Sequence, residues 1–192
     1  MIIKNMKKII AVFSLLLCSQ VNAALITSVQ SPYQTSVQYP FTLVGSVFSV
    51  DIIGTDFISN VDGGGVNLSF DQSMLNVLSV SIDESIWNFG STGISTGTID
   101  NAAGTVDGIM VNTFADVAGD FVIATIEFEA IGLGSSFLSL TELGINPWAS
   151  AGSLINPTYE SLQVDVSAIP VPAAVWLFGS GLIGLLGIAR RK

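Results

Sequence analysis

Apolar and polar residues alternate with a period of two through the middle of the chain, between residues 24 and 168. Over residues 48–52, for example, three apolar residues are separated by Ser49 and Asp51. A period of two gives a segment one apolar face and one polar face, which is typical of a half-buried strand. We find no stretch of this region with the period of a helix. The same alternation recurs over residues 66–71, 78–82, 125–130 and 162–166.

Segments rich in glycine and polar residues separate these runs and are typical of turns. They are residues 62–65, 90–93, 101–108 and 132–134. About eight or nine short strands joined in this way predict an all-β fold, an antiparallel β-sandwich with jelly-roll or Greek-key connections. Residues 27–46 and 141–158 lack clean alternation, so we expect edge strands or long loops there.

The predicted body, residues 24–168, is one domain long enough to bury a core without disulfides. Four phenylalanines fall on the apolar faces of its strands and are expected in that core. They are Phe48, Phe70, Phe121 and Phe128.

The first end of the chain has the pattern of a secretory signal peptide. Three lysines precede the apolar run 9–18, and Ala23 follows it at a position suited to signal peptidase. This predicts a signal helix within residues 1–23 and cleavage after Ala23. The alternatives are an uncleaved N-terminal anchor and a lipoprotein acylated at Cys18.

The other end predicts a transmembrane helix over residues 173–189, which carry no charge. A helix of this length covers about 26 Å, enough for a thin bilayer. The basic tail Arg190, Arg191 and Lys192 follows directly and should stay in the cytoplasm. The body would then lie on the outer face of the inner membrane.

Residues 171–182, with the basic tail 190–192, resemble the PEP-CTERM sorting signal of Gram-negative bacteria. In that family a short proline motif precedes a membrane helix, and an exosortase, a membrane-embedded cysteine protease, releases or transfers the protein. The resemblance implies an exosortase partner and processing over residues 169–192. The family signature is Pro-Glu-Pro, whereas this chain has Val171 between Pro170 and Pro172.

The composition of the body excludes several chemistries. All fifteen carboxylates lie between the two ends, the six bases lie at the ends, and the chain has no histidine. Its one cysteine, Cys18, belongs to the predicted signal peptide. Triads that need histidine, thiol nucleophiles, lysine Schiff bases, and thiolate or histidine metal sites are therefore excluded from the body. Nucleic acid would meet only repulsion.

Carboxylates leave two kinds of site open. A pair of them could hydrolyse a glycoside, and a cluster of oxygen ligands could bind calcium. None has the spacing of a helix-loop-helix calcium loop, and solvated turn residues are the alternative interpretation. The candidates are Asp51, Asp56, Asp62, Asp107, Asp116 and Asp120.

A second resemblance covers residues 41–166. Residues 48–52 and 65–80, followed by 121–130 and 134–136, resemble the strands of a cohesin domain. The resemblance implies a jelly roll of nine strands, related to carbohydrate-binding modules. Cohesins bind dockerin modules in cellulose-degrading assemblies, but the contacts used for that binding are not recognisable in this chain.

These observations favour a non-catalytic binding or structural module, transiently anchored in the inner membrane and finally at the outer surface or in the extracellular matrix. Its predicted partner is an extracellular polysaccharide or a matrix protein, without a cofactor or metal. Four aromatic residues near turns, Trp87, Phe89, Trp148 and Tyr159, could stack on sugar rings or be buried loop anchors. The alternatives are a small glycoside hydrolase and an adhesin stiffened by calcium.

Overall fold

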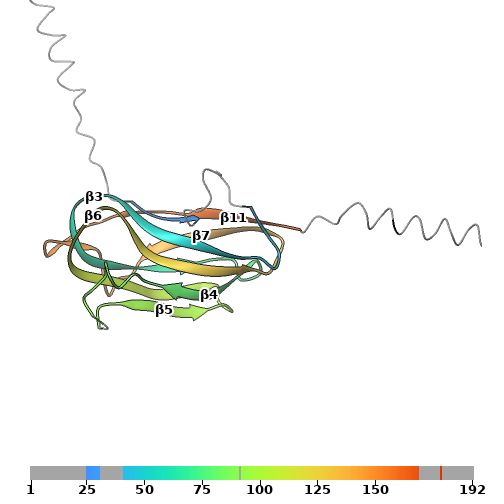
Figure 1. Cartoon of the computed structure of the whole chain (residues 1–192), viewed down its shortest axis with the longest axis horizontal. Helices are drawn as coiled ribbons and strands as arrows, with labels where there is room; N and C mark the ends of the chain where they lie inside the picture. The colour runs from blue at the N-terminus through green and yellow to red at the C-terminus, as the bar shows by residue number, and fades with distance from the viewer. Residues whose placement is uncertain (1–24, 31–40, 91, 169–177, 179–192) are drawn as a thin grey trace, which may run out of the picture.

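The computed structural model describes residues 25–30, 41–90, 92–168 and 178 (Figure 1). Every secondary-structure element in this part of the chain is a strand. The strands are β1 (Leu25–Gln30), β2 (Phe41–Leu43), β3 (Val47–Ser69), β4 (Leu75–Ser81), β5 (Ser95–Asp100), β6 (Thr105–Ala130), β7 (Gly134–Glu142), β8 (Ala149–Ser150), β9 (Ser153–Leu154), β10 (Thr158–Glu160) and β11 (Leu162–Ser167).

The segments predicted to direct export are not part of this description. The signal peptide 1–23 with Ala23, and the sorting segment 169–192 except for Phe178, lie outside the described residues. The processing positions Pro170, Pro172, Arg190 and Arg191 lie outside them too. Within the residues that the structure describes, no helix is long and apolar enough to cross a membrane.

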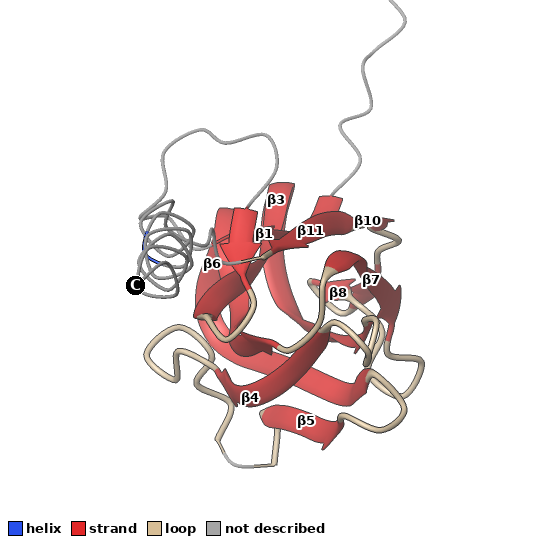
Figure 2. Ribbon diagram, turned by 90° about the vertical axis from the view of Figure 1, so that its right-hand side faces the viewer, coloured by secondary structure: helices blue, strands red, loops and turns tan. Residues whose placement is uncertain are grey.

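β3 and β6 are the longest strands, and each belongs to both layers of the fold. In one layer the order is β10, β1, the first half of β3, the second half of β6, and β4. In the other layer it is β5, the first half of β6, the second half of β3, β7, β11 and β2. Figure 2 shows β4 and β5 on one side of the sandwich and β1, β10 and β11 on the opposite side.

The sheet is mixed, which corrects the predicted purely antiparallel arrangement. β1 pairs with β10, and β11 with β2, in parallel. Each of these pairs joins strands from distant parts of the chain, so no hairpin constrains their direction. The eleven strands of the described residues include four of two or three residues, β2, β8, β9 and β10. The first three lie in the segments without clean alternation, and β10 begins at the end of one of them.

The predicted core is confirmed. Phe70, Phe121 and Phe128 are buried, and Phe48 is partly buried against the same cluster. The ring of Phe128 stacks on Phe48 with a centroid distance of 5.6 Å. It also meets the edge of Phe70 at 5.8 Å. Phe48 and Phe128 are cross-strand partners within one layer, whereas Phe70 follows the half of β3 that belongs to the other layer. The aromatic core therefore links the two layers through the apolar faces that alternation predicts.

The sequence predicted a turn at the glycine run 63–65, but these residues lie inside the second half of β3. A Cβ atom on Gly64 would overlap the indole ring of Trp148, and one on Gly65 would lie 2.7 Å from Leu143 Cδ2. Glycine here lets neighbouring side chains pack directly on the backbone of a strand. Composition alone does not separate this use of glycine from a turn.

Candidate binding site

Two of the four aromatic residues predicted to contact a ligand are core residues. Trp87 and Trp148 have exposed fractions of 0%. Their rings contact each other edge to face at 6.5 Å, and both also contact Phe121. The ring faces that a sugar would need are covered by other aromatic rings, so the buried-anchor interpretation applies to both tryptophans.

Trp87 fixes the loop between β4 and β5. Its indole Nε1 donates a hydrogen bond to the carbonyl oxygen of Val122 at 2.9 Å. On the same loop, Thr113 Oγ1 of β6 donates to the Ile86 carbonyl at 2.8 Å. Asn88 Oδ1 accepts from the Phe114 amide at 3.0 Å. The loop is therefore tied to β6 on both sides of Trp87.

This loop places Phe89 on the surface against Phe114, a residue that sequence analysis missed. The two rings stack with centroids 4.4 Å apart and 24° between their planes. Phe89 is 44% exposed and Phe114 is 77% exposed. The signal available in the sequence was that Phe114 occupies the polar face of β6, where alternation predicts no large apolar residue.

Tyr159 is half-buried, and its hydroxyl group is buried without a hydrogen-bond partner among the described residues. Burial raises the pKa of the phenol well above its ordinary value, and the charge of Glu142 raises it further. The ring packs against the core cluster. Tyr159 therefore offers little free ring surface to a ligand.

The bent end of the sandwich, which we define as residues 55–62 of β3, residues 113–120 of β6 and the β8–β9 hairpin, carries most of the candidate carboxylates. The pairing of β3 with β6 shifts register repeatedly there. Asp56 has a φ of 59°, and its amide donates to Asp120 Oδ1 at 3.2 Å. Asn60 Nδ2 donates to Asp116 Oδ1 at 2.6 Å. These hydrogen bonds link β3 to β6 at the bend, where the register shifts interrupt the regular backbone hydrogen bonds between the two strands.

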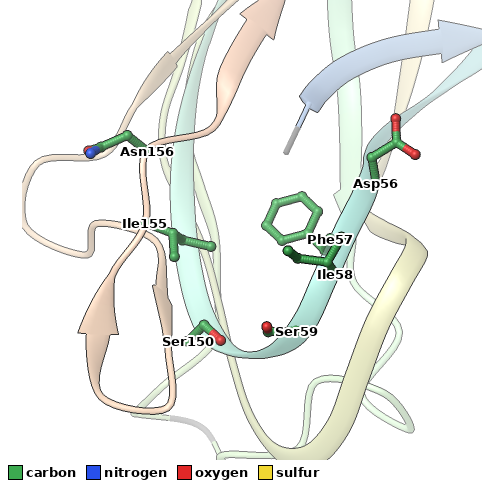
Figure 3. A pocket seen from close by; sticks show the side chains of 7 residues that line it. All are labelled: Asp56, Phe57, Ile58, Ser59, Ser150, Ile155 and Asn156. Atoms are coloured by element: carbon green, nitrogen blue, oxygen red, sulfur yellow. The ribbon is translucent and has the colours of Figure 1, made fainter. Parts of the chain in front are cut away.

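Two neighbouring pockets open at the bent end. The smaller has a volume of about 240 Å³. Figure 3 shows Phe57 and Ile155 facing its interior from opposite walls, with Ser59 and Ser150 at one end. The wider pocket measures about 550 Å³, shares Ser59 and Ser150 with the first, and is more open. It is completed by Asn60, Asp62, Asp116 and Ala151.

The structure places four of the six candidate carboxylates at the bent end and the other two, Asp51 and Asp107, elsewhere. Asp62 and Asp116 line the same wide pocket, and Asp56 lines the smaller one. Asp51 is buried and accepts a hydrogen bond from Thr125 Oγ1, whereas Asp107 accepts one from Thr105 Oγ1. In the part of the chain that the structure describes, no three carboxylates gather into a group that could hold a metal ion. The geometry therefore leaves two neighbouring pairs at the bent end: Asp62 with Asp116 at the wide pocket, and Asp56 with Asp120, joined by the bond from the Asp56 amide.

The carboxyl groups with perturbed pKa values lie elsewhere and have structural causes. Hydrogen bonds from the Ser73 hydroxyl and amide lower the pKa of Asp71, and the same two groups of Ser85 lower that of Asp83. The Ser135 hydroxyl and then the Gln163 amide lower the pKa of Asp165. Each carboxylate accepts bonds that stabilise its charged form. A lowered pKa moves each of these three carboxyl groups further from the range that suits proton transfer near neutral pH.

No protein-family model and no curated protein matches the chain. Solved structures do match. A chain of a type I cohesin–dockerin complex from Clostridium thermocellum has a TM-score of 0.61 and 12% identity, over 76% of this chain and 100% of that chain. The body has a cohesin-like fold.

Other cohesins agree with this assignment of the fold. The seventh ScaB type I cohesin from Pseudobacteroides cellulosolvens has a TM-score of 0.55 and 16% identity, over 78% of this chain and 96% of that one. A non-cellulosomal cohesin from Archaeoglobus fulgidus has a TM-score of 0.53 and 12% identity, over 76% and 91%. At these identities the similarity shows that the backbones follow the same path. It does not identify binding residues in this chain.

Proposed function

We propose that this chain is a non-catalytic, exported protein-binding module. The observation that carries the proposal is the cohesin-like fold, because solved neighbours with this fold include a cohesin–dockerin complex. A body without histidine, lysine or arginine also suits binding better than catalysis.

The partner would dock on the outer face of β3, β7 and β11. Phe137 of β7 is 59% exposed between the buried residues Ser136 and Leu138, so its ring projects away from the core. In the register of the sheet it lies opposite Gln163. An exposed aromatic ring among hydrogen-bonding side chains is a typical anchor for a protein partner.

Export would place this module outside the inner membrane, which matches the resemblance of residues 171–182 to a PEP-CTERM signal. In this proposal the signal peptide is removed after Ala23, and an exosortase processes the chain near Pro170 and Pro172. The helix 173–189 and its basic tail would anchor the chain only until that step. The mature module would remain at the outer surface or in the extracellular matrix.

One experiment in exporting cells tests binding and processing together. A photo-crosslinking phenylalanine analogue is placed at position 137, and at position 78 on β4 as the matched control, since Leu78 is 46% exposed on the opposite layer. We expect a protein adduct at position 137 and none at position 78. The Phe137→Ala variant should then bind the identified partner at least about tenfold more weakly.

Mass spectrometry of the same exported protein reads out the processing. We expect the tail from residue 176 onward to be absent in normal cells and present in cells lacking the exosortase. An intact tail in normal cells would contradict the sorting proposal. Equal crosslinking at positions 137 and 78 would contradict the docking face, whatever the state of the tail.

A further inference from the structure

We propose that the bent end of the sandwich holds a second binding site, a cleft for a neutral polysaccharide with the Phe114–Phe89 pair as its aromatic platform. This site is separate from the proposed protein-docking face, because Phe114 lies on the bend of β6 whereas Phe137 lies on β7.

The platform is an exposed aromatic surface held in a fixed position. Phe114 is 77% exposed, and Phe89 supports it by stacking. The Phe89 amide donates to the Asn112 carbonyl at 3.2 Å. A Cβ atom on Gly93 would lie 2.5 Å from Phe89 Cδ1, so glycine at that position makes room for the ring. Exposed apolar surface rimmed by polar residues is typical of binding sites, and the stacked pair joins two exposed rings into one such surface.

Hydrogen-bonding groups continue from the platform along the bend of β6. Phe114 and Asp116 are both exposed and only two positions apart in the segment 113–116, where the register with β3 shifts, so the platform lies next to this carboxylate. Asp116 leads into the wide pocket with Asn60 and Asp62. Carboxylate oxygens keep acceptor capacity beyond the single bonds that Asn60 and the Gly152 amide donate to them. They can therefore accept hydrogen bonds from sugar hydroxyl groups.

The small pocket extends this surface further. It joins the wide pocket at Ser59 and Ser150 and brings an apolar wall, Phe57 and Ile155, next to the two hydroxyl groups. Small-molecule sites commonly combine an apolar lining with a few placed polar groups. Along the bent end, the aromatic platform is followed by the wide polar pocket and then by the small pocket, which has both apolar and polar groups. Such a row of sites suits the successive sugar units of a polysaccharide.

The charge of the body selects the class of polysaccharide. All fifteen carboxylates and none of the six bases lie in the body, and Asp56, Asp62 and Asp116 border the two pockets. A polyuronate or sulfated glycan would be repelled at this surface. A neutral glycan brings hydroxyl donors for the carboxylates and apolar ring faces for the phenylalanines.

Native affinity electrophoresis of the full-length protein tests the site. Gels contain hydroxyethylcellulose, xyloglucan or galactomannan as neutral polymers and alginate as the anionic one. We expect at least one neutral polymer to retard the protein and alginate not to. Phe114→Ala should weaken that binding at least about tenfold, and Phe114→Trp should retain it, because the larger ring preserves the platform.

Phe137→Ala is the matched control, since it removes an exposed phenylalanine from the other surface and should leave the retardation unchanged. Ser59→Gln is an independent variant that fills the space shared by the two pockets and should also weaken binding. The proposal is overturned if no neutral polymer retards the protein, if alginate retards it equally, or if Phe114→Ala and Ser59→Gln both bind as tightly as the wild type. None of these results would alter crosslinking at position 137, so the two proposals fail separately.

Discussion

At the residue scale, the contact between Gly64 and Trp148 organises the bent end of the sandwich. The fully buried indole ring lies directly over the backbone of β3 at Gly64, and Phe57 and Phe121 pack beside it. A side chain at position 64 would have to displace this ring. The same ring helps to support the wall of the small pocket through Phe57. Stability and the shape of the candidate cleft therefore depend on one glycine.

Gly64→Ala should lower the free energy of unfolding by about 1–3 kcal/mol, because the added methyl group forces the indole out of its packed position. Urea denaturation followed by tryptophan fluorescence measures the change. Gly144→Ala is the control, since a Cβ atom there has nothing within 4 Å, and its effect should stay within about 0.5 kcal/mol. Equal midpoints for the two variants would show that Trp148 does not require this glycine.

At the scale of elements, two asparagine side chains form hydrogen bonds with backbone groups where the register between paired strands shifts. The pairing of β4 with β6 shifts register between Val77 and Ser79. Asn101 fills that irregularity, because its Oδ1 accepts from the Val77 amide at 2.8 Å and its Nδ2 donates to the Val77 carbonyl at 3.0 Å. Asn67 Oδ1 likewise accepts from the Gly108 amide at 2.9 Å. These bonds give the backbone groups of Val77 and Gly108 side-chain partners beside the two register shifts.

Asn101→Ala should cost about 1–3 kcal/mol, since it leaves a part-buried amide and carbonyl of Val77 without partners. Thermal unfolding followed by circular dichroism, with hydrogen exchange at the Val77 amide, checks both the stability and the location of the effect. Asn156→Ala, at an exposed position, is the control and should change little. Unchanged protection of the Val77 amide in Asn101→Ala would contradict this role.

At the scale of the whole molecule, the described body is an acidic sandwich with two separate candidate surfaces. Residues 25–168 contain all fifteen carboxylates and no base, so repulsion among like charges acts against the compact state. The cohesin-like fold tolerates this because its carboxylates are mostly spread over exposed positions, with hydrogen bonds from neutral groups at Asp71, Asp83 and Asp165.

Raising the salt concentration from 0.01 to 0.15 M NaCl at pH 7 should raise the melting temperature, because the screening length falls from about 30 Å to about 8 Å. The shift should be smaller at pH 3, where most carboxyl groups are protonated and the repulsion is already reduced. Differential scanning calorimetry measures it, with sucrose of equal osmolality as the control. A melting temperature that is unchanged or lower in 0.15 M salt would contradict the repulsion argument.

Prediction from the sequence succeeded where periodicity is local. Alternation identified the strands around Val50 and Ile126, and the phenylalanine core, because a period of two depends only on neighbouring residues. Prediction from the sequence failed where the role of a residue depends on a contact with a residue far away in the chain. Residues 62–65 resembled a turn although Trp148 requires them inside a strand. Phe114 escaped notice because its stacking partner Phe89 comes from a distant segment, the loop between β4 and β5.

The sequence by itself determined an all-β body, an acidic surface, and the absence of histidine, lysine and arginine between residues 24 and 189. It also supplied the two terminal patterns that predict export. Only the tertiary structure decided that Trp87 and Trp148 are core residues, that Asp62 and Asp116 share a pocket, and that Phe89 and Phe114 form one platform. The physical reason is that composition and period are properties of the chain, whereas burial and proximity arise when β3 and β6 bend and bring distant segments together.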